Sequence, residues 1–279
     1  MFSIYSSMFN VVKMNFDWKD AIQNWFDFLD GRGQISIAVN TSEDDSFEEI
    51  KKFCELIKRE NVLSHTVFTI FQTSFPYDDP EFDGKIKNAA LKNCKEKFCI
   101  LLDCDERIGL WNRPSWEKYA QSLERDSVDA YLIPVLDLCK AKETFKSIGS
   151  KWYLHKNLPT IRRGVVNFAR LENGAIDIKK SDTCEAIYED GSLIRAKPLV
   201  DPHLPNYMKL YAMQDGEIPL VYHLGWLDAP QRLNQSAYWR EVWIARAQNE
   251  DAVDDILKTA DDFNKIEVFL HGLQSWENR

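Results

Sequence analysis

Strand-like and helical patterns alternate between residues 18 and 103, and this alternation restricts the fold more than any other feature of the sequence. Apolar residues at helical spacing or helix-forming composition predict helices over residues 18–29, 46–60 and 85–96. Short β-rich runs predict strands over residues 35–39, 65–72 and 97–103. Strands that alternate with helices form a parallel sheet covered on both faces. The sequence therefore predicts an α/β fold with a mostly parallel central sheet, in which Ser46 caps the second helix.

The pattern changes in the second half of the chain. Another buried strand is expected over residues 129–136, and beyond residue 150 shorter strand-like pieces alternate with turns. Residues 237–276 have a helical pattern. We expect a mixed C-terminal extension of the same sheet, followed by C-terminal helices. In terms of domains, this predicts a catalytic domain over residues 1–230 and a helical extension over residues 231–279 that packs on it.

Composition excludes several classes of protein. With 279 residues, of which 44% are hydrophobic, the chain can bury a substantial core. The net charge of −9 gives no general attraction to nucleic acid or anionic lipid. The six cysteines include no CxxC pair, and neither a signal peptide nor a run of about 20 apolar residues is present. We expect a cytoplasmic protein with reduced thiols and no integral membrane segment.

The most informative motif is Asp103-Cys104-Asp105, which directly follows the apolar run at 98–102. In open α/β sheets, ligands bind at the carboxyl ends of the parallel strands. Residues two apart in an extended segment point to the same side, so both carboxylates can reach one hard cation. The pair predicts a site for Mg²⁺ or Mn²⁺ that offsets the charge on a diphosphate leaving group. The alternative interpretation is a polar strand end without chemistry.

Two stretches of the chain resemble a known family. The segments SIAVNTSEDDSFEEI at 36–50 and FDGKIKNAALKNCKEKFCILLDCDER at 82–107 resemble the first half of a family-two-type glycosyltransferase of the GT-A fold. The resemblance covers residues 18–110 and returns at His223 in VYHLGWLD. It implies a nucleotide-sugar-binding fold and a metal-dependent hexosyl- or pentosyltransferase.

The resemblance also implies a role for individual residues. In the family, the loop after the opening strand binds the base and ribose of the donor. Residues of the helix predicted over 85–96 would also approach the donor. These donor-binding residues are Asn40, Thr41, Glu43, Asp44, Lys85 and Asn88. Asp103 would lie near the ribose or a metal-bound water, Asp105 would bind the Mn²⁺ or Mg²⁺ cofactor directly, and His223 would be a third metal residue.

An inverting transfer needs a base that removes the proton of the acceptor hydroxyl. The segment KSDTCEAIYEDG supplies Asp182 and Glu185, at a place where relatives of this fold carry an acidic residue near the acceptor. The alternative interpretation, which the 44 Asp and Glu residues of the chain favour for either one alone, is that they are ordinary turn or helix-start acids. The expected donor is a UDP-sugar, and the acceptor stays open among a glycan, a lipid-linked sugar, a protein side chain and a modified nucleic-acid base.

Three other functions are alternatives to sugar transfer. A phosphatase of the haloacid dehalogenase type also carries Asp-x-Asp after an apolar strand, but has Thr or Val where this chain has Arg107. A sugar-nucleotide nucleotidyltransferase would have a Gly-rich, basic loop after its first strand, whereas NTSEDDS at 40–46 is acidic and lacks glycine. A non-catalytic binding module would have lost the two carboxylates.

Overall fold

The computed structural model describes most of the first 158 residues and a second stretch near residue 200. The described ranges are 1–41, 43–76, 79, 82–139, 141–158 and 195–226, with the backbone of short strands at 161–163, 169–170, 176–177, 186–188 and 268–269.

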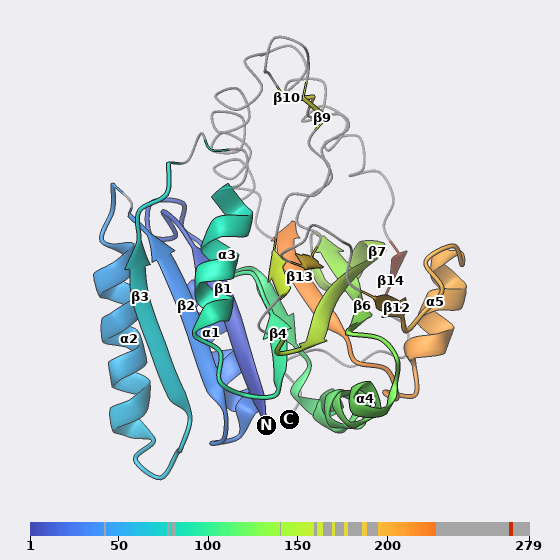
Figure 1. The fold of residues 1–279 in the computed structure, drawn as a ribbon. Helices are drawn as coiled ribbons and strands as arrows, with labels where there is room; N and C mark the ends of the chain where they lie inside the picture. The colour runs from blue at the N-terminus through green and yellow to red at the C-terminus, as the bar shows by residue number, and fades with distance from the viewer. Residues whose placement is uncertain are drawn as a thin grey trace.

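The first half of the chain forms strands and helices in strict alternation. These elements are β1 (Phe2–Met8), α1 (Trp18–Leu29), β2 (Gln34–Asn40), α2 (Ser46–Glu60), β3 (Val67–Thr73), α3 (Phe82–Lys92) and β4 (Phe98–Leu101). Their strands are parallel and lie in the order β3-β2-β1-β4 (Figure 1). The strand order reverses beside β1, and all four strands end at the same edge of the sheet. In open α/β folds this is where ligands bind.

Strand β1 was not predicted, although it lies at the centre of the parallel sheet. It pairs with β2 on one side and with β4 on the other. Serines interrupt its apolar residues, but Ser3 and Ser6 are fully buried, and the Ser3 hydroxyl donates a hydrogen bond to Gln34 Oε1 at 2.9 Å. The Ser3 hydroxyl is thus satisfied inside the protein, whereas the Ser6 hydroxyl has no hydrogen-bond partner among the described residues. These two polar positions interrupt the apolar pattern, so hydrophobicity alone did not reveal this strand.

The second half of the sheet is mixed, as predicted. Its elements are β5 (Glu106–Ile108), η1 (Leu110–Asn112), α4 (Arg113–Arg125), β6 (Ala130–Cys139), β7 (Ala141–Lys156), β12 (Ala196–Pro198), α5 (Asn206–Met213) and β13 (Val221–Trp226). The sheet continues from β4 in the order β7-β6-β13-β5. Strand β7 is antiparallel to both β4 and β6, whereas β13 is parallel to β6 and antiparallel to β5.

The remaining strands of the described residues are short. They are β8 (Ile161–Arg163), β9 (Ala169–Arg170), β10 (Ile176–Asp177), β11 (Ala186–Tyr188) and β14 (Val268–Phe269). Two of them, β8 and β11, pair with each other, and β9 pairs with β10. Strand β14 is antiparallel to β7, so two residues within the tail predicted to be helical belong to the main sheet. The rest of the tail beyond residue 226 lies outside the described residues, and its helical character stays a prediction.

Helices cover both faces of the parallel sheet, and side chains alternate between the two faces. Ile4, Ile35 and Ile100 share a core with residues of α1, α2 and α4. Their neighbours Tyr5 and Cys99 face the opposite side, where they pack with α3. A third cluster joins α5 to β6, β7 and β13. This two-sided burial confirms the predicted α/β class with a largely parallel central sheet and a mixed extension.

The boundaries of two predicted helices needed correction. Helix α2 begins at Ser46 itself with Asp45 in the N-cap position. The Ser46 hydroxyl, which was predicted to cap the helix, instead accepts a hydrogen bond from the backbone N–H of Val12 at 3.2 Å. Helix α3 begins at Phe82, three residues earlier than predicted, and ends at Lys92. The three added residues at its start include Gly84, which is buried inside the helix.

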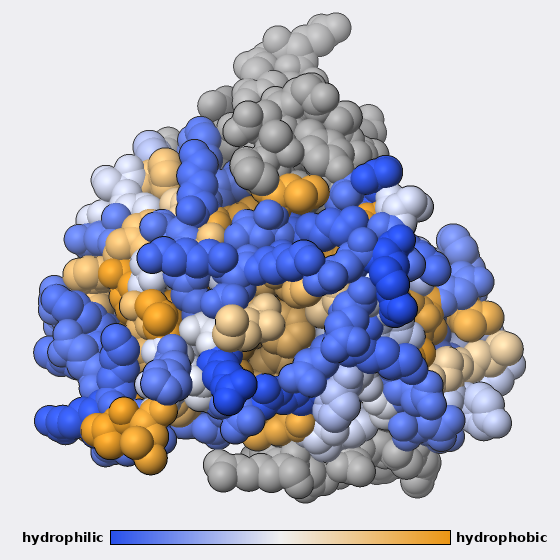
Figure 2. All heavy atoms as spheres, turned by 60° about the horizontal axis from the view of Figure 1, so that its bottom comes forward, coloured by the Kyte–Doolittle hydropathy of each residue, from blue (hydrophilic) through white to orange (hydrophobic). Residues whose placement is uncertain are grey.

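The face shown in Figure 2 is mainly hydrophilic, with smaller apolar areas scattered among the hydrophilic side chains, one of them at its lower left. The turn between α2 and β3 carries Val62 and Leu63, which are among the exposed large apolar residues. Within the residues that the structure describes, none of the helices has the length and apolar character needed to cross a membrane.

Candidate functional site

The Asp-x-Asp motif lies at the carboxyl end of β4, in the short connection to β5. Strand β4 ends at Leu101 and β5 begins at Glu106, so both aspartates stand at the edge where the parallel strands end. The backbone carbonyl of Asp105 accepts a hydrogen bond from the N–H of Leu224 at 2.8 Å. This bond fastens the motif to β13, which begins more than one hundred residues later in the chain.

Asp105 contacts His223, as the predicted metal site requires. Asp105 Oδ2 lies 3.2 Å from His223 Nε2, and His223 Nδ1 lies 2.8 Å from Asp137 Oδ1. Asp137 is the register partner of His223 across the parallel pair β6 and β13. The imidazole is therefore fixed between two carboxylates that come from different elements. Asp137 was not predicted from the sequence.

Electrostatics of this group follow from the same contacts. Burial disfavours the charged form of the Asp105 carboxyl, but the neighbouring His223 outweighs it and lowers the pKa of Asp105. Burial likewise opposes protonation of His223, yet Asp105 and Asp137 raise the pKa of this imidazole well above its ordinary value. Each group of the trio thus stabilises the charged state of its neighbours.

Asp103 has different partners from Asp105. Its Oδ1 lies 2.9 Å from the ammonium of Lys87 on α3, and its Oδ2 lies 2.7 Å from the ammonium of Lys151 on β7. Burial alone would raise the pKa of Asp103, but the two lysines outweigh burial and hold it well below its usual range. The two aspartates of the motif therefore contact different side chains.

Glu106 connects the motif to β7. Its side chain is almost fully buried and accepts hydrogen bonds from the Tyr153 hydroxyl at 2.6 Å and from the Lys151 ammonium at 3.0 Å. Its other oxygen accepts a hydrogen bond from the backbone N–H of Asp103 at 2.8 Å. One carboxylate therefore fixes both the motif backbone and the lysine that neutralises Asp103.

Four of the predicted donor-binding residues lie at and after the end of β2. The Asn40 amide holds the end of β3, because its Oδ1 accepts hydrogen bonds from the Thr73 hydroxyl at 3.1 Å and the Phe75 N–H at 2.8 Å. The hydroxyl of Thr41 donates to the Thr73 carbonyl. These two side chains therefore join neighbouring strand ends, and their donor contacts stay a prediction.

Glu43 and Asp44 contact the segment that follows β1. Glu43 forms an ion pair with the Lys13 ammonium at 3.0 Å, and Asp44 Oδ2 accepts a hydrogen bond from the Lys13 backbone N–H at 2.8 Å. The loop after β2 thus lies against residues 9–17, the true first loop of the sheet. Because β1 was not predicted, the donor-binding loop was predicted to follow β2, and no role was predicted for residues 9–17.

Two predicted residues lie on α3. Lys85 forms an ion pair with Asp79 in the segment that precedes the helix, and Asn88 is half-buried. The contact between α3 and the motif is made instead by Lys87, which lies between them in the sequence. The predicted bases Asp182 and Glu185 lie outside the described residues.

The residues that sequence analysis missed carried weak local signals or none. Glu106 directly follows the motif, and Lys87 lies two residues after the predicted Lys85. Their positions in the sequence were therefore the signal that could have identified both residues. Lys151 and Asp137 come from the β6–β7 hairpin, whose strands carried no chemical motif. Only strand pairing brings them to the site.

Asp105 and His223 fit a divalent cation. In an octahedral site with bonds of about 2.1 Å, two adjacent ligand atoms lie about 3 Å apart. The observed separation of 3.2 Å between Asp105 Oδ2 and His223 Nε2 matches that spacing. No group of three or more His, Cys, Asp and Glu side chains in the described part of the chain is placed to hold a metal. A cation here would therefore need water or phosphate oxygens for its remaining positions, as Mg²⁺ does in many phosphate sites.

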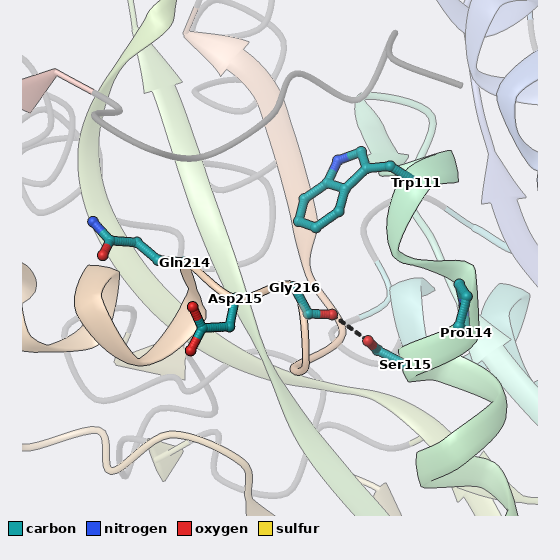
Figure 3. Close-up of a pocket in the computed structure, with 6 residues that line it drawn as sticks. All are labelled: Trp111, Pro114, Ser115, Gln214, Asp215 and Gly216. Carbon is teal, nitrogen blue, oxygen red and sulfur yellow. Dashed lines mark hydrogen bonds between the residues drawn. The ribbon is translucent and has the colours of Figure 1, made fainter.

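A separate small cavity, of about 190 Å³, lies between the start of α4 and the turn after α5 (Figure 3). Its lining residues are Trp111, Pro114, Ser115, Gln214, Asp215 and Gly216. Gly216 has a φ of +67°, and a Cβ there would lie 2.6 Å from the Trp111 ring. The Ser115 hydroxyl donates a hydrogen bond to the Gly216 carbonyl across the cavity. None of the predicted site residues lines this cavity.

Comparison with known proteins gives similarity only at the level of structure. No protein-family model matches the chain, and no curated protein matches its sequence. A structure of Staphylococcus aureus TarS 1-349 in complex with UDP-GlcNAc is 19% identical with a TM-score of 0.32, and the match covers 48% of this chain and 34% of that one. This chain thus spans about a third of that structure's length.

Two other solved structures are similar over longer stretches. S. aureus TarS 1-349 in complex with UDP is 13% identical with a TM-score of 0.34, over 98% of this chain and 99% of that chain. The inositol-1-phosphate CTP transferase from T. maritima is 7% identical with a TM-score of 0.33, over 84% and 93% of the two chains. The functional assignment therefore depends on the side chains of the site itself.

Proposed function

We propose that this chain is a glycosyltransferase that moves a sugar from a nucleotide diphosphate donor to an acceptor hydroxyl, with a divalent cation held by Asp105 and His223. The observation that carries the proposal is the contact of these two residues, 118 positions apart in the sequence, at the carboxyl edge of the parallel sheet. Two metal-binding side chains that meet at the expected ligand edge are consistent with a built site rather than a polar strand end.

Each charged group of the site has a role in this proposal. Asp105 and His223 hold the cation, and Asp137 keeps the imidazole aimed at Asp105. When bound, the cation would supply positive charge that offsets the negative charge developing on the departing nucleoside diphosphate. Asp103, whose two oxygens contact Lys87 and Lys151, is proposed to act as a supporting contact to the ribose or to a metal-bound water.

The transfer itself is proposed to invert the anomeric centre. A bond forms between the acceptor oxygen and the anomeric carbon while the bond from that carbon to the diphosphate oxygen breaks, and its electron pair leaves with the nucleoside diphosphate. The acceptor proton passes to a base, for which Asp182 and Glu185 remain the candidates. A UDP-sugar is the proposed donor, in line with the UDP and UDP-GlcNAc named for the similar TarS structures.

A nucleotidyltransferase is the main alternative, and the corrected first strand bears on it. Such an enzyme would need a Gly-rich, basic phosphate loop after its first strand. The loop after β1 covers residues 9–17, FNVVKMNFD, which contains no glycine and a single lysine. That lysine, Lys13, is paired with Glu43. Transfer of a sugar is therefore favoured over transfer of a nucleotide.

The proposal is tested by isothermal titration of UDP, GDP, ADP, CDP and dTDP with and without Mn²⁺ or Mg²⁺. We expect one nucleotide to bind in the presence of metal and to lose most of its affinity in EDTA. Asp105→Asn should lose the metal-dependent part of the affinity, because asparagine has nearly the size of aspartate but lacks the negative charge that binds the metal. Hydrolysis or transfer of the matching nucleotide sugar would then be followed by product analysis.

Asp201→Asn provides the matched control, because Asp201 is an exposed aspartate whose carboxylate accepts a hydrogen bond from the nearby His203 backbone N–H. It should retain the wild-type affinity. Binding that does not depend on metal, or unchanged turnover in Asp105→Asn, would rule out the proposed mechanism.

A further inference from the structure

The Lys151 side chain contacts the Asp-x-Asp motif, although Lys151 lies 48 positions after Asp103 in the sequence. Strand β7 is antiparallel to β4, with Ile100 opposite Leu154. Continued past the end of β4, this register places Asp103 opposite Lys151. The Lys151 ammonium contacts Asp103 Oδ2 at 2.7 Å and Glu106 Oε1 at 3.0 Å. The β-sheet itself, rather than a flexible loop, therefore carries a positive charge to the motif.

The Lys151 ammonium is held by a support that is itself buried. Glu106 bonds to the lysine, and Tyr153, two residues further along β7, donates its hydroxyl to the same Glu106 oxygen at 2.6 Å. The other Glu106 oxygen accepts the Asp103 N–H. A charge fixed in this way needs no reorganisation when a ligand arrives, which is the condition for effective electrostatic stabilisation.

The two lysines beside Asp103 differ in accessibility. The Lys87 side chain is 9% exposed, whereas the Lys151 side chain is 34% exposed. An ammonium group has three N–H donors, and two of those on Lys151 point at the two carboxylates. Lys151 is thus the lysine that a ligand at this edge of the sheet can reach, while Lys87 mainly neutralises Asp103 from the α3 side.

We propose that Lys151 is a donor-site residue that binds the second phosphate of the nucleoside diphosphate, and that Glu106 positions it. The inference rests on the proposed function and extends it. The donor site would have two positive charges: the divalent cation at Asp105 and His223, and the fixed ammonium of Lys151 beside Asp103. Lysine acts as a compact point charge toward phosphate, which suits a diphosphate that already shares its oxygens with a metal.

The test compares a nucleoside diphosphate with its monophosphate in the presence of metal. The probe is the nucleotide that wild-type protein binds most tightly, and the readout is the ratio of the two dissociation constants. Losing one charge-assisted contact is worth about a 10- to 100-fold change in affinity. Lys151→Met should therefore reduce the preference for the diphosphate by about 10-fold or more, and should leave monophosphate affinity nearly unchanged.

Further variants separate a contact with the ligand from a loss of structure. Lys151→Arg keeps the charge and should retain most of the preference. Glu106→Gln should weaken the preference while monophosphate affinity persists, a split that general destabilisation would not produce. Lys151→Met leaves Glu106 without its ammonium partner, whereas Asp103 keeps Lys87. The double variant Lys151→Met/Glu106→Gln removes that unpaired charge and should behave as Lys151→Met does. Thermal melts verify that each variant is folded.

Lys52→Met is the control, since Lys52 is an exposed lysine of α2 paired with Glu49. It should bind both nucleotides as the wild-type protein does. An unchanged preference in folded Lys151→Met, or equal loss for the two nucleotides, would overturn the assignment of Lys151. If the wild-type protein binds no nucleotide, the proposed function fails, and inorganic pyrophosphate then decides the inference. Lys151-dependent binding of pyrophosphate supports the phosphate contact, and binding that is absent or independent of Lys151 refutes it.

Discussion

At the scale of residues, the two aspartates of the motif differ because their partners differ. Asp105 meets an imidazole that can share a cation with it, whereas both oxygens of Asp103 contact lysine ammonium groups. Identical side chains two positions apart thus have different partners, although cationic neighbours lower the pKa of both. The distinction between a direct metal ligand and a supporting contact, which the family resemblance implied, is consistent with these surroundings and stays a prediction.

The contact between Asp137 and His223 leads to a first prediction. A carboxylate that accepts a hydrogen bond from a ligating histidine fixes the ring and its tautomer, and removing such a partner costs about 10- to 100-fold in metal affinity. We expect Asp137→Asn to weaken Mn²⁺ binding in the presence of nucleotide by at least about 10-fold. Mn²⁺ titration followed by electron paramagnetic resonance measures the change. Equal Mn²⁺ affinity in Asp137→Asn and in the exposed control Asp201→Asn would contradict this role.

Cys54 on α2 gives a prediction about alkaline pH. Burial raises the pKa of its thiol to about 12, from 9.0 in a solvated thiol. Above pH 9 the unfolded chain therefore loses this proton while the folded protein keeps it, so stability falls as pH rises toward 12. We expect the loss of unfolding free energy between pH 9 and pH 10.5 to be about 1.5 kcal/mol smaller in Cys54→Ala than in the wild-type protein.

Urea denaturation at the two pH values measures the unfolding free energy of each protein. Comparing the change with pH in the two proteins removes the cost of the smaller side chain, which is the same at both pH values. Parallel losses in the two proteins would show that the Cys54 thiol does not contribute.

At the scale of elements, a buried arginine joins the first helix to the motif loop. Arg107 on β5 is completely buried, and its guanidinium donates to Asp20 Oδ2 at 2.7 Å, to the Asp17 carbonyl at 2.7 Å and to the Cys104 carbonyl at 3.1 Å. In the sequence, Arg107 indicates only that the chain departs from the phosphatase motif. In the fold it connects the start of α1 with the segment that carries the aspartates.

Arg107→Lys should therefore be strongly destabilising, although it keeps the charge. An ammonium cannot reproduce the forked set of donors, and breaking a buried ionic contact costs about 3 kcal/mol. Arg113→Lys is the matched control, because Arg113 is partly exposed and its pairs with Asp30 and Glu117 lie at the surface. We expect the control to change the unfolding free energy by less than about 1 kcal/mol. Chemical denaturation compares the two variants, and similar costs would disprove a special role for Arg107.

At the scale of the whole molecule, the site is built from elements that are distant in sequence. Asp103 and Asp105 follow β4, His223 lies on β13, and the supporting side chains come from α3, β5, β6 and β7. A ligand that contacts these elements together should stabilise the folded chain as a unit, since it binds the folded state and not the unfolded one.

We therefore expect the melting temperature to rise only when nucleotide and metal are present together. At a ligand concentration 100-fold above the dissociation constant, the gain is about 2.7 kcal/mol, which corresponds to a shift of about 5 °C for a chain of this size. EDTA should abolish the shift, and Asp105→Asn should lack it. Differential scanning fluorimetry measures each condition, and a shift that survives EDTA would argue against a metal-dependent donor site.

Local sequence patterns were sufficient for most elements of the parallel half. Helix α1 and strand β2 lie where periodicity placed them, since each buries one face or both faces through residues that are close together in the chain. The position of the motif at a strand end was also readable, because an apolar run followed by two acids is a local pattern. Strand β1 was not predicted because the buried polar residues Ser3 and Ser6 interrupt its apolar pattern.

By itself, then, the sequence determined the α/β class and the position of the motif after a buried strand. That Asp105 and His223 bind a metal is a prediction from the motif and the family resemblance. Tertiary structure alone decided which strand lies at the centre of the sheet and which groups surround each aspartate. The reason is physical: Lys151 and Asp137 reach the site through the registers of β7 with β4 and of β6 with β13. Pairing between distant strands depends on hydrogen bonds and packing across the whole sheet, and no local window of residues contains that information.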